Sequence, residues 1–373
     1  MVPNRALARS RWTALVLVAC ALLLATQCLS ARRTTASQVR HTVGRGDARH
    51  GRARTGDADF GSAPAFARAD VALLKSALAC DSVCQYLSDA NAAITRSGVA
   101  VLRRSFTCPR VWLRLLGACP AQQWPPPTTV PASMHAAFTM NGAMAEETFY
   151  FQQRYSGGEA LQNDWDPLDL DARIAAPDVR TATDGVFTYT LKTSVYVDNV
   201  LAQYAPAINN GAGLVWGSER PWAEIILARR GAAHVLTVEY GHVATTHSII
   251  SATTPQLFAA FMAQSPRQFD FVFTFSSLEH SGLGRYGDEL NPYGDLEAVA
   301  QSWCALKPGG LLFLGVPSED AASSQDKLVW NAHRYYGPKR LAQMFAGFEH
   351  VRSHGQGSEP AESVIHVLRK LAV

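Results

Sequence analysis

The sequence predicts an α/β fold with a mainly parallel sheet in the carboxyl-terminal half of the chain. From residue 214 onward, short apolar runs alternate with amphipathic segments, which is typical of strands joined by helices. One apolar run, Phe269–Ser276, leads directly into a loop of polar residues, and a second, Leu311–Val316, follows a Pro-Gly-Gly turn. Because open α/β sheets bind ligands beyond the carboxyl ends of their parallel strands, this loop is the first candidate for a site.

The predicted elements alternate in a regular order. Strands are expected at Gly213–Gly217, His234–Tyr240, Ser248–Ser251, Phe269–Ser276, Leu311–Val316, Phe348–Ser353 and Ser363–Leu371. Helices are expected at Pro221–Arg230, Pro255–Gln264, Gly294–Leu306 and Pro338–Phe345. The first of these helices has proline in its first turn and Gly231 after its end, which are preferred positions for both residues. The third carries Leu296, Val299 and Trp303 on one face, as a packed helix does.

The chain before residue 206 is predicted to hold three further parts. Residues 1–30 form a signal anchor or signal peptide, residues 31–70 a flexible stem, and residues 71–205 a mainly helical cap, followed by the α/β domain at residues 206–373. Arginines flank the apolar run Trp12–Leu29, which is near the lower limit of about 17 residues for a membrane span. The run is also compatible with a cleaved signal peptide or with an organelle transit peptide. We expect a single-pass membrane or secretory-pathway protein of the endoplasmic reticulum or Golgi lumen, with organelle targeting as the alternative.

Composition and cysteine content narrow the class of protein. With 47% hydrophobic and 17% charged residues, the 373-residue chain can build a sizeable core. The net charge of +3 gives no reason to expect a nucleic-acid partner. Cys304 lies among apolar residues and is predicted to be a buried free thiol. Cysteines 80, 84, 108 and 119 form an even set whose pairing the sequence leaves open, and no metal site is expected.

The turn after the first predicted strand is the candidate cofactor site. It contains Gly217, Ser218 and Glu219 and leads into a helix, whose first N–H groups can bind a ligand. Glu239 closes the second strand at the spacing of about 20 residues at which an acid binds ribose hydroxyls. The Gly211–Gly213 segment precedes its strand and is not expected to bind. The alternatives are a plain strand–helix turn and a strand end that faces solvent.

The loop after the fourth predicted strand and the segment after the fifth supply the remaining candidates. His280 and Glu279 are the predicted catalytic residues, because a histidine can take a proton near neutral pH, and Ser277 is a further cofactor candidate. A histidine that only fixes the loop is the alternative. Candidates for substrate binding are Tyr286, Asp288, Asn291, His333 and Arg334. Asp295 is predicted to cap the following helix in preference to binding a cation.

Several motifs carry a resemblance to known families. The LEH after the fourth strand and the LKPGG before the fifth resemble those of class I, Rossmann-like, S-adenosylmethionine-dependent methyltransferases. The motifs GSERPW, TVEYG, SSLEHSGLGRYGDELNPYGDLEA, LKPGG and NAHRYYG, within residues 206–371, resemble domain-of-unknown-function family 268. The resemblance implies a sheet with one antiparallel strand, the seventh, inserted in a terminal hairpin, and helices on both faces. It also implies S-adenosylmethionine as the cofactor, bound by Gly217, Ser218, Glu219, Glu239, Ser277 and Glu279.

Three functions remain open at this point. The first is a methyltransferase in an endomembrane compartment, acting on a glycan or other small-molecule acceptor and held at the membrane by its amino-terminal segment. The second is a catalytically inactive methyltransferase-like scaffold or binding protein. The third is a glycosyltransferase-like enzyme, for which the sequence offers only the weak pair of acids Asp288 and Asp295.

Overall fold

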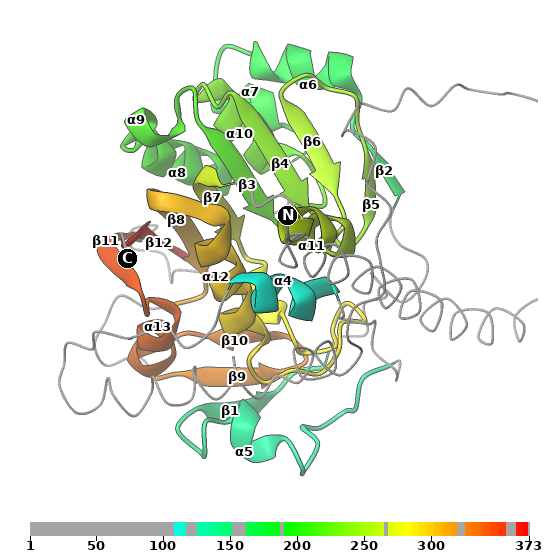
Figure 1. Ribbon diagram of the computed structural model, residues 1–373, viewed down its shortest axis with the longest axis vertical. Helices are drawn as coiled ribbons and strands as arrows, with labels where there is room; N and C mark the ends of the chain where they lie inside the picture. The colour runs from blue at the N-terminus through cyan, green and yellow to red at the C-terminus, as the bar shows by residue number, and fades with distance from the viewer. Residues whose placement is uncertain are drawn as a thin grey trace, which may run out of the picture. The chain divides into compact units, whose positions relative to one another are not determined.

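A seven-stranded sheet organises the described part of the protein (Figure 1). The computed structural model describes residues 108–116, 125–150, 162–186, 190–264, 268–318, 325–355 and 363–371, which belong to one compact unit, Cys80–Val373. The predicted anchor, the stem and the first part of the predicted cap lie outside these residues. Among the helices that are described, none is long and apolar enough to cross a membrane.

The strand order of the sheet is β11-β12-β8-β7-β3-β4-β6. The strands are β3 (Ala212–Trp216), β4 (His234–Val238), β6 (Ile250–Thr253), β7 (Phe269–Phe275), β8 (Leu306–Val316), β11 (Phe348–His354) and β12 (Val364–Lys370). β12 is antiparallel to both of its neighbours, and the other neighbouring pairs are parallel. The terminal hairpin with its last strand inserted antiparallel is what the resemblance implied, and the α/β fold class is confirmed.

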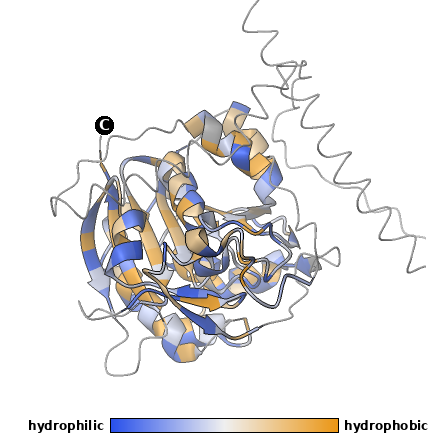
Figure 2. Cartoon of the chain, turned by 90° about the horizontal axis from the view of Figure 1, so that it is seen from below, coloured by the Kyte–Doolittle hydropathy of each residue, from blue (hydrophilic) through white to orange (hydrophobic). Residues whose placement is uncertain are grey.

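Helices cover both faces of the sheet because its strands are apolar on both sides. In β7 and β8 nearly all residues from Phe271 and Leu311 onward are buried, as expected for strands packed between two layers. One face packs against α6 (Pro167–Ile174), α7 (Val179–Thr183), α8 (Leu191–Ala202), α9 (Ala205–Ile208) and α10 (Trp222–Arg229). The other packs against α4 (Cys108–Leu116), α11 (Pro255–Gln264), α12 (Gly294–Ala305) and α13 (Pro338–Met344). Figure 2 shows the apolar residues concentrated along the central strands.

Segments from before residue 206 interleave with the sheet domain. β1 (Ala145–Thr148) pairs with β9 (Lys327–Trp330), which also pairs with β10 (His333–Tyr335). β2 (Gln162–Asp164) pairs with β5 (His242–Ala244), and the short helix α5 (His135–Phe138) adds Phe138 to a small third core around Trp330. The described part of the predicted cap therefore contains strands as well as helices. The domain boundary at residue 205 stays a prediction.

The fifth predicted strand is longer than the sequence indicated. β8 begins at Leu306 and includes the Lys-Pro-Gly-Gly stretch that we expected to be a turn. Leu306 pairs with Phe269 and Leu311 pairs with Phe271, so the residues between them form a bulge. Gly309 lies in this bulge at φ 79°, a conformation that glycine adopts readily. The Pro-Gly-Gly stretch does interrupt the regular backbone, as predicted, but it lies within β8 and does not precede the strand.

The prediction that Cys304 is a free thiol is wrong. Cys304 forms a disulfide with Cys108, with the two Cα atoms 5.5 Å apart, and thereby joins α12 to α4. Cys304 is buried, as its apolar neighbours indicated. Its partner lies 196 positions away in the sequence, and no local pattern connects residues at that separation. Cysteines 80, 84 and 119 lie outside the described residues.

Candidate functional site

A cavity of about 470 Å³ lies at the carboxyl ends of β3, β4 and β7. These strands flank the point where the strand order of the sheet reverses, which is where open α/β sheets bind ligands. The predicted site residues that line it are Gly217, Ser218, Glu219, Glu239, Ser277, His280, Tyr286, Asp288 and His333. Trp216 and Trp222 form part of its wall without filling it. The structure therefore brings most of the predicted site residues together.

Gly217 shapes the turn between β3 and α10. Its φ is 68°, and a Cβ atom at this position would overlap the side chain of Ser277, which follows β7. Its N–H donates to the carbonyl of Val238 at 3.0 Å, which ties the turn to the end of β4. A single glycine thus allows three strand ends to approach one another. By contrast, Gly213 lies inside β3 against the ring of Phe271, so the upstream glycines serve packing.

We predict that Gly217→Ala disturbs this turn. The new Cβ requires an unfavourable positive φ and displaces Ser277, so we expect a loss of about 1–3 kcal/mol in the free energy of unfolding. Urea denaturation of the full chain measures this loss. The control is Gly142→Ala, because Gly142 also has a positive φ but has no atom within 4 Å of the added Cβ. Equal losses in the two variants would contradict the role of the Ser277 contact.

Glu239 provides a carboxylate at the end of β4. Its Oε1 accepts hydrogen bonds from the N–H groups of Tyr240 at 2.7 Å and Gly241 at 3.3 Å. Burial raises the pKa of Glu239, although these N–H groups favour its charged form. The carboxylate is therefore oriented by its own turn at the position predicted for binding a ribose. Tyr240, which the sequence reasoning did not select, lines the cavity beside it.

His280 lies on the short 3₁₀ helix η1 (Leu278–His280), which follows β7. Its Nδ1 lies 2.6 Å from the carbonyl oxygen of Ala332. Because a carbonyl oxygen only accepts, Nδ1 carries the proton, and Nε2 is left as an acceptor. Burial lowers the pKa of His280 to about 3, and the neighbouring Arg285 acts in the same direction. His280 is therefore a neutral imidazole at the cavity wall.

Glu279 does not line the cavity. Its side chain is fully buried, with Oε1 3.6 Å from His280 Nε2. Burial raises the pKa of Glu279 to about 7, against a hydrogen bond from Ser276 that lowers it. The 3₁₀ turn places Glu279 beside His280, and its other neighbour, Ser276, also lines the cavity. Glu279 can therefore affect the cavity through these two residues.

The glycine-rich loop after η1 folds back on itself. The glycines at 282, 284 and 287 have φ values of 79°, 71° and 80°. Asp288 holds the loop by accepting from the N–H groups of Gly282 at 2.6 Å and Tyr286 at 3.3 Å. Tyr286, Arg285, His280 and His333 form one wall, in which the Arg285 guanidinium lies 5.0 Å from the Tyr286 ring centre.

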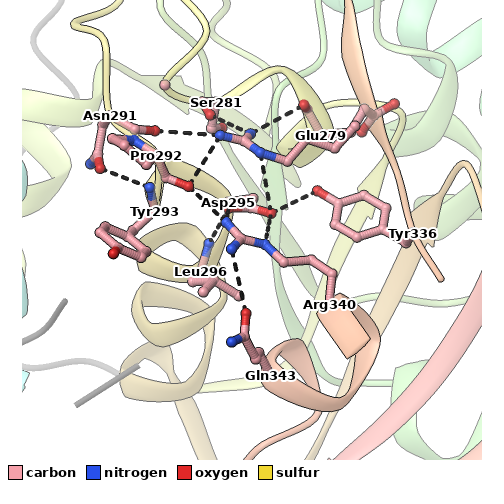
Figure 3. Close-up of polar contacts among 12 residues, drawn as sticks. Glu279, Ser281, Asn291, Pro292, Tyr293, Asp295, Leu296, Tyr336, Arg340 and Gln343 are labelled. Carbon is pink, nitrogen blue, oxygen red and sulfur yellow. Dashed lines mark hydrogen bonds and ion pairs between the residues drawn. The ribbon is translucent and has the colours of Figure 1, made fainter. Parts of the chain in front are cut away.

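Arg334 and Asn291, two predicted substrate contacts, belong to a buried polar network below the loop (Figure 3). Arg334 is 1% exposed and donates to the carbonyl of Ser281 at 2.7 Å. Asn291 Oδ1 accepts from the N–H of Tyr293 at 2.9 Å. Neither residue lines the cavity, and both stabilise the loop that does.

Asp295 is the centre of this network. Arg340 contacts its two carboxylate oxygens at 2.5 and 3.0 Å, and the hydroxyl of Tyr336 donates to Oδ2 at 3.1 Å. Burial raises the pKa of Asp295, but Arg334 and Arg340 outweigh it and hold that pKa below its usual value. The prediction that Asp295 caps α12 is wrong, because Tyr293 is the cap residue. The carboxylate pairs with arginines from two other segments.

The cavity has the size of a small-molecule binding site. Its volume lies within the range of about 300–1,000 Å³ for small-molecule sites. A carboxylate and a glycine turn lie at the ends of adjacent strands, and Val238, Leu278 and Trp216 supply apolar surface. Within the described ranges, no group of three or more His, Cys, Asp or Glu side chains is arranged to hold a metal ion.

Several residues that line the cavity were not predicted from the sequence. They are Leu115, Asn163, Tyr240, Arg285 and Gln301. Arg285 and Tyr240 are adjacent to selected residues, and a wider window would have included them. Leu115 and Asn163 come from segments far upstream, and the sequence holds no signal that places them here.

Comparisons with known proteins find one matching family model and several similar solved structures. The family model described as "Caenorhabditis protein of unknown function, DUF268" matches residues 210–370. Among curated proteins, none matches the chain.

Similar solved structures include several methyltransferases. The 1,6-didemethyltoxoflavin-N1-methyltransferase of Burkholderia thailandensis, solved with its substrate and S-adenosylhomocysteine, is 16% identical, with a TM-score of 0.35 over 55% of this chain and 91% of that one. The magnesium protoporphyrin IX methyltransferase of Synechocystis, solved with S-adenosylmethionine, is 15% identical, with a TM-score of 0.35 over 54% and 90%. The fold is assigned from the strand order of the sheet itself, and residues 210–370 are similar to the DUF268 family model.

Proposed function

We propose that this domain is an S-adenosylmethionine-dependent methyltransferase. One observation supports the proposal above all others. Gly217, Glu239, Ser277 and His280 follow three separate strands, yet they line the same cavity at the reversal point of the sheet. Gly217 and Glu239 would hold the adenosyl part of the cofactor, by close backbone approach and by accepting hydrogen bonds from ribose hydroxyls. When bound, the cofactor would supply an electrophilic methyl group.

His280 is the residue best placed to act on the acceptor. His280 lines the cavity and its Nε2 is an acceptor, so in this proposal it orients a hydroxyl or amine of the acceptor and receives its proton. A neutral imidazole of low pKa is a weak base by itself. Glu279, 3.6 Å from Nε2, stabilises a proton on His280 when its carboxyl is ionised. Glu279 is therefore a positioning residue in this proposal, and His280 makes the contact.

The acceptor and the compartment are further parts of the proposal. We propose a glycan or another small molecule as acceptor, and the secretory pathway as location. The Cys108–Cys304 disulfide supports an oxidising compartment, because disulfides are rare in proteins of the cytosol. The arginine-flanked apolar run Trp12–Leu29 supports targeting to the membrane or the secretory pathway, and it lies outside the described residues.

Calorimetric titration of the full chain with S-adenosylhomocysteine tests the cofactor site. We expect binding by the wild-type protein. We expect Glu239→Ala to weaken it at least about tenfold, because one charge-assisted hydrogen bond contributes about 1.5–3 kcal/mol. The control is Glu349→Ala, which removes an exposed carboxylate paired with Arg369 on β11–β12, away from the cavity.

The outcomes of this titration separate the methyltransferase from the inactive scaffold, two of the functions that the sequence left open. Wild-type affinity in Glu349→Ala together with weak binding in Glu239→Ala supports the methyltransferase. No heat of binding and no thermal shift at millimolar S-adenosylhomocysteine would overturn it and favour a scaffold that kept the sheet and lost the cofactor.

A further inference from the structure

A fully buried carboxyl group lies beneath the cofactor turn. Glu224 is in the first turn of α10 and is 0% exposed, in a helix whose other residues from Trp222 to Ala228 are apolar. Its Oε1 accepts from the hydroxyl of Thr237 on β4 at 2.6 Å, and its Oε2 lies 3.0 Å from the hydroxyl of Ser218. Glu224 thus connects the turn after β3 with the strand that ends at Glu239.

The hydrogen bonds around Ser218 indicate which groups carry protons. The Ser218 hydroxyl lies 2.8 Å from the carbonyl oxygen of Arg220 and 3.0 Å from Glu224 Oε2. It has one hydrogen to donate, and both neighbouring oxygens are acceptors if Glu224 is ionised. A proton on Glu224 Oε2 satisfies every contact. Glu224 then donates to Ser218, Ser218 donates to Arg220, and Thr237 donates to Glu224.

We propose that Glu224 acts as a neutral carboxylic acid and is the positioning residue that locks the single-glycine turn onto β4 in its ligand-binding shape. The inference rests on the proposed function, because the ligand is the adenosyl cofactor of that site. It accounts for how this turn keeps its shape: hydrogen bonds from the buried acid connect Ser218 in the turn to Thr237 on β4.

The surroundings of Glu224 favour its neutral form. Burial raises the pKa of Glu224 to about 7, and the hydroxyls of Thr237 and Ser218 act against this rise. The charged group that acts on it from the neighbouring strand is Glu239, which raises the pKa further. α6, α7 and α8 contribute apolar side chains to the core around α10, including Leu170, Ala182 and Val197.

Titration with S-adenosylhomocysteine between pH 6 and 8.5 tests the proposal. Wild-type affinity is expected to fall by roughly tenfold per pH unit above pH 7, as Glu224 loses its proton and the turn loosens. Glu224→Gln keeps one acceptor and one donor, so it should bind within about threefold of wild type at pH 6.5 and show no such decline. Glu224→Leu should bind at least about tenfold more weakly at every pH, because it keeps the volume and loses both hydrogen bonds.

A matched control is Glu297→Gln, which neutralises another buried acid whose pKa is raised by burial, on α12 and outside the cavity lining. Its pH profile of binding should match that of wild type. Coinciding profiles for wild type and Glu224→Gln, or weak binding by Glu224→Gln at pH 6.5, would overturn the proposal.

Thermal unfolding without ligand keeps this inference separate from the proposed function. The raised pKa means that the folded protein holds the proton of Glu224 more tightly than the unfolded chain does. This stabilisation is complete below the ordinary pKa of 4.5 and is lost as the pH rises to about 7. The wild-type midpoint should therefore fall by several degrees relative to Glu224→Gln between pH 4.5 and 7.5. A difference in unfolding midpoint between wild type and Glu224→Gln that does not change with pH would overturn the role of Glu224. Failure to bind S-adenosylhomocysteine, with the expected change in midpoint present, would overturn only the methyltransferase proposal.

Discussion

Replacing Asp295 by alanine is expected to lower the free energy of unfolding by about 3–5 kcal/mol. Asp295 is fully buried and pairs with Arg340, and the Nε of Arg334 lies 3.7 Å from its Oδ2. Both arginines are buried, so removing the carboxylate leaves two positive charges with little water around them. Breaking a buried pair on one side costs much more than the pair contributes as a whole, because the remaining charges stay desolvated.

The same substitution should also affect the site. Arg334 donates to the carbonyls of Ser281 and Glu279, so its displacement loosens the segment that carries His280. Urea denaturation at pH 7 measures the stability. The control is Asp169→Ala, which breaks an exposed pair with Arg173 one helical turn away and should cost no more than about 0.5 kcal/mol. Similar losses in the two variants would show that the buried network contributes no more than a surface pair.

Removing the Cys108–Cys304 disulfide is expected to cost about 2–5 kcal/mol under oxidising conditions. The bond links residues 196 positions apart, and closing a long loop restricts the unfolded chain strongly. It also holds α4 against α12, next to the cavity that Leu115 of α4 lines. Cys108→Ala, Cys304→Ala and the double variant are compared by urea denaturation. If the cross-link is the cause, the double variant should lose about as much as either single one.

Reductant provides the second arm of this experiment. It should destabilise the wild-type protein more than the Cys108→Ala variant, in which this bond is already absent. Losses that simply add in the double variant, or equal effects of reductant on both proteins, would contradict a stabilising disulfide between these residues.

The order of elements could be read from the sequence because their signals are local. Alternation of apolar runs with helical segments located β3, β4, β7 and the helices between them to within about two residues. The least accurate prediction was β8, where Phe269 and Phe271 of the neighbouring strand pair on either side of the Pro-Gly-Gly stretch. That pairing depends on a second strand, which local turn chemistry does not specify.

The sequence predicted the location of the cavity more accurately than it predicted which side chains line it. Gly217, Glu239 and His280 were located correctly at the cavity because each closes or follows a strand, and parallel strands all end at the same edge. Glu279 and Arg334 were also selected from the sequence, but their side chains are buried. Glu224 was overlooked because a single acid in an apolar helix has no sequence pattern of its own, although its presence there was a usable signal.

The sequence by itself determined the order of the sheet elements and the edge of the sheet at which the cavity lies. Both follow from local periodicity and from the direction that parallel strands share. The tertiary structure decided which polar groups reach the cavity, which pair in the core as Asp295 does with Arg340, and which cysteine joins Cys108. The physical reason is that the state of a polar side chain depends on its burial and its partners, and these partners come from segments that only folding brings together.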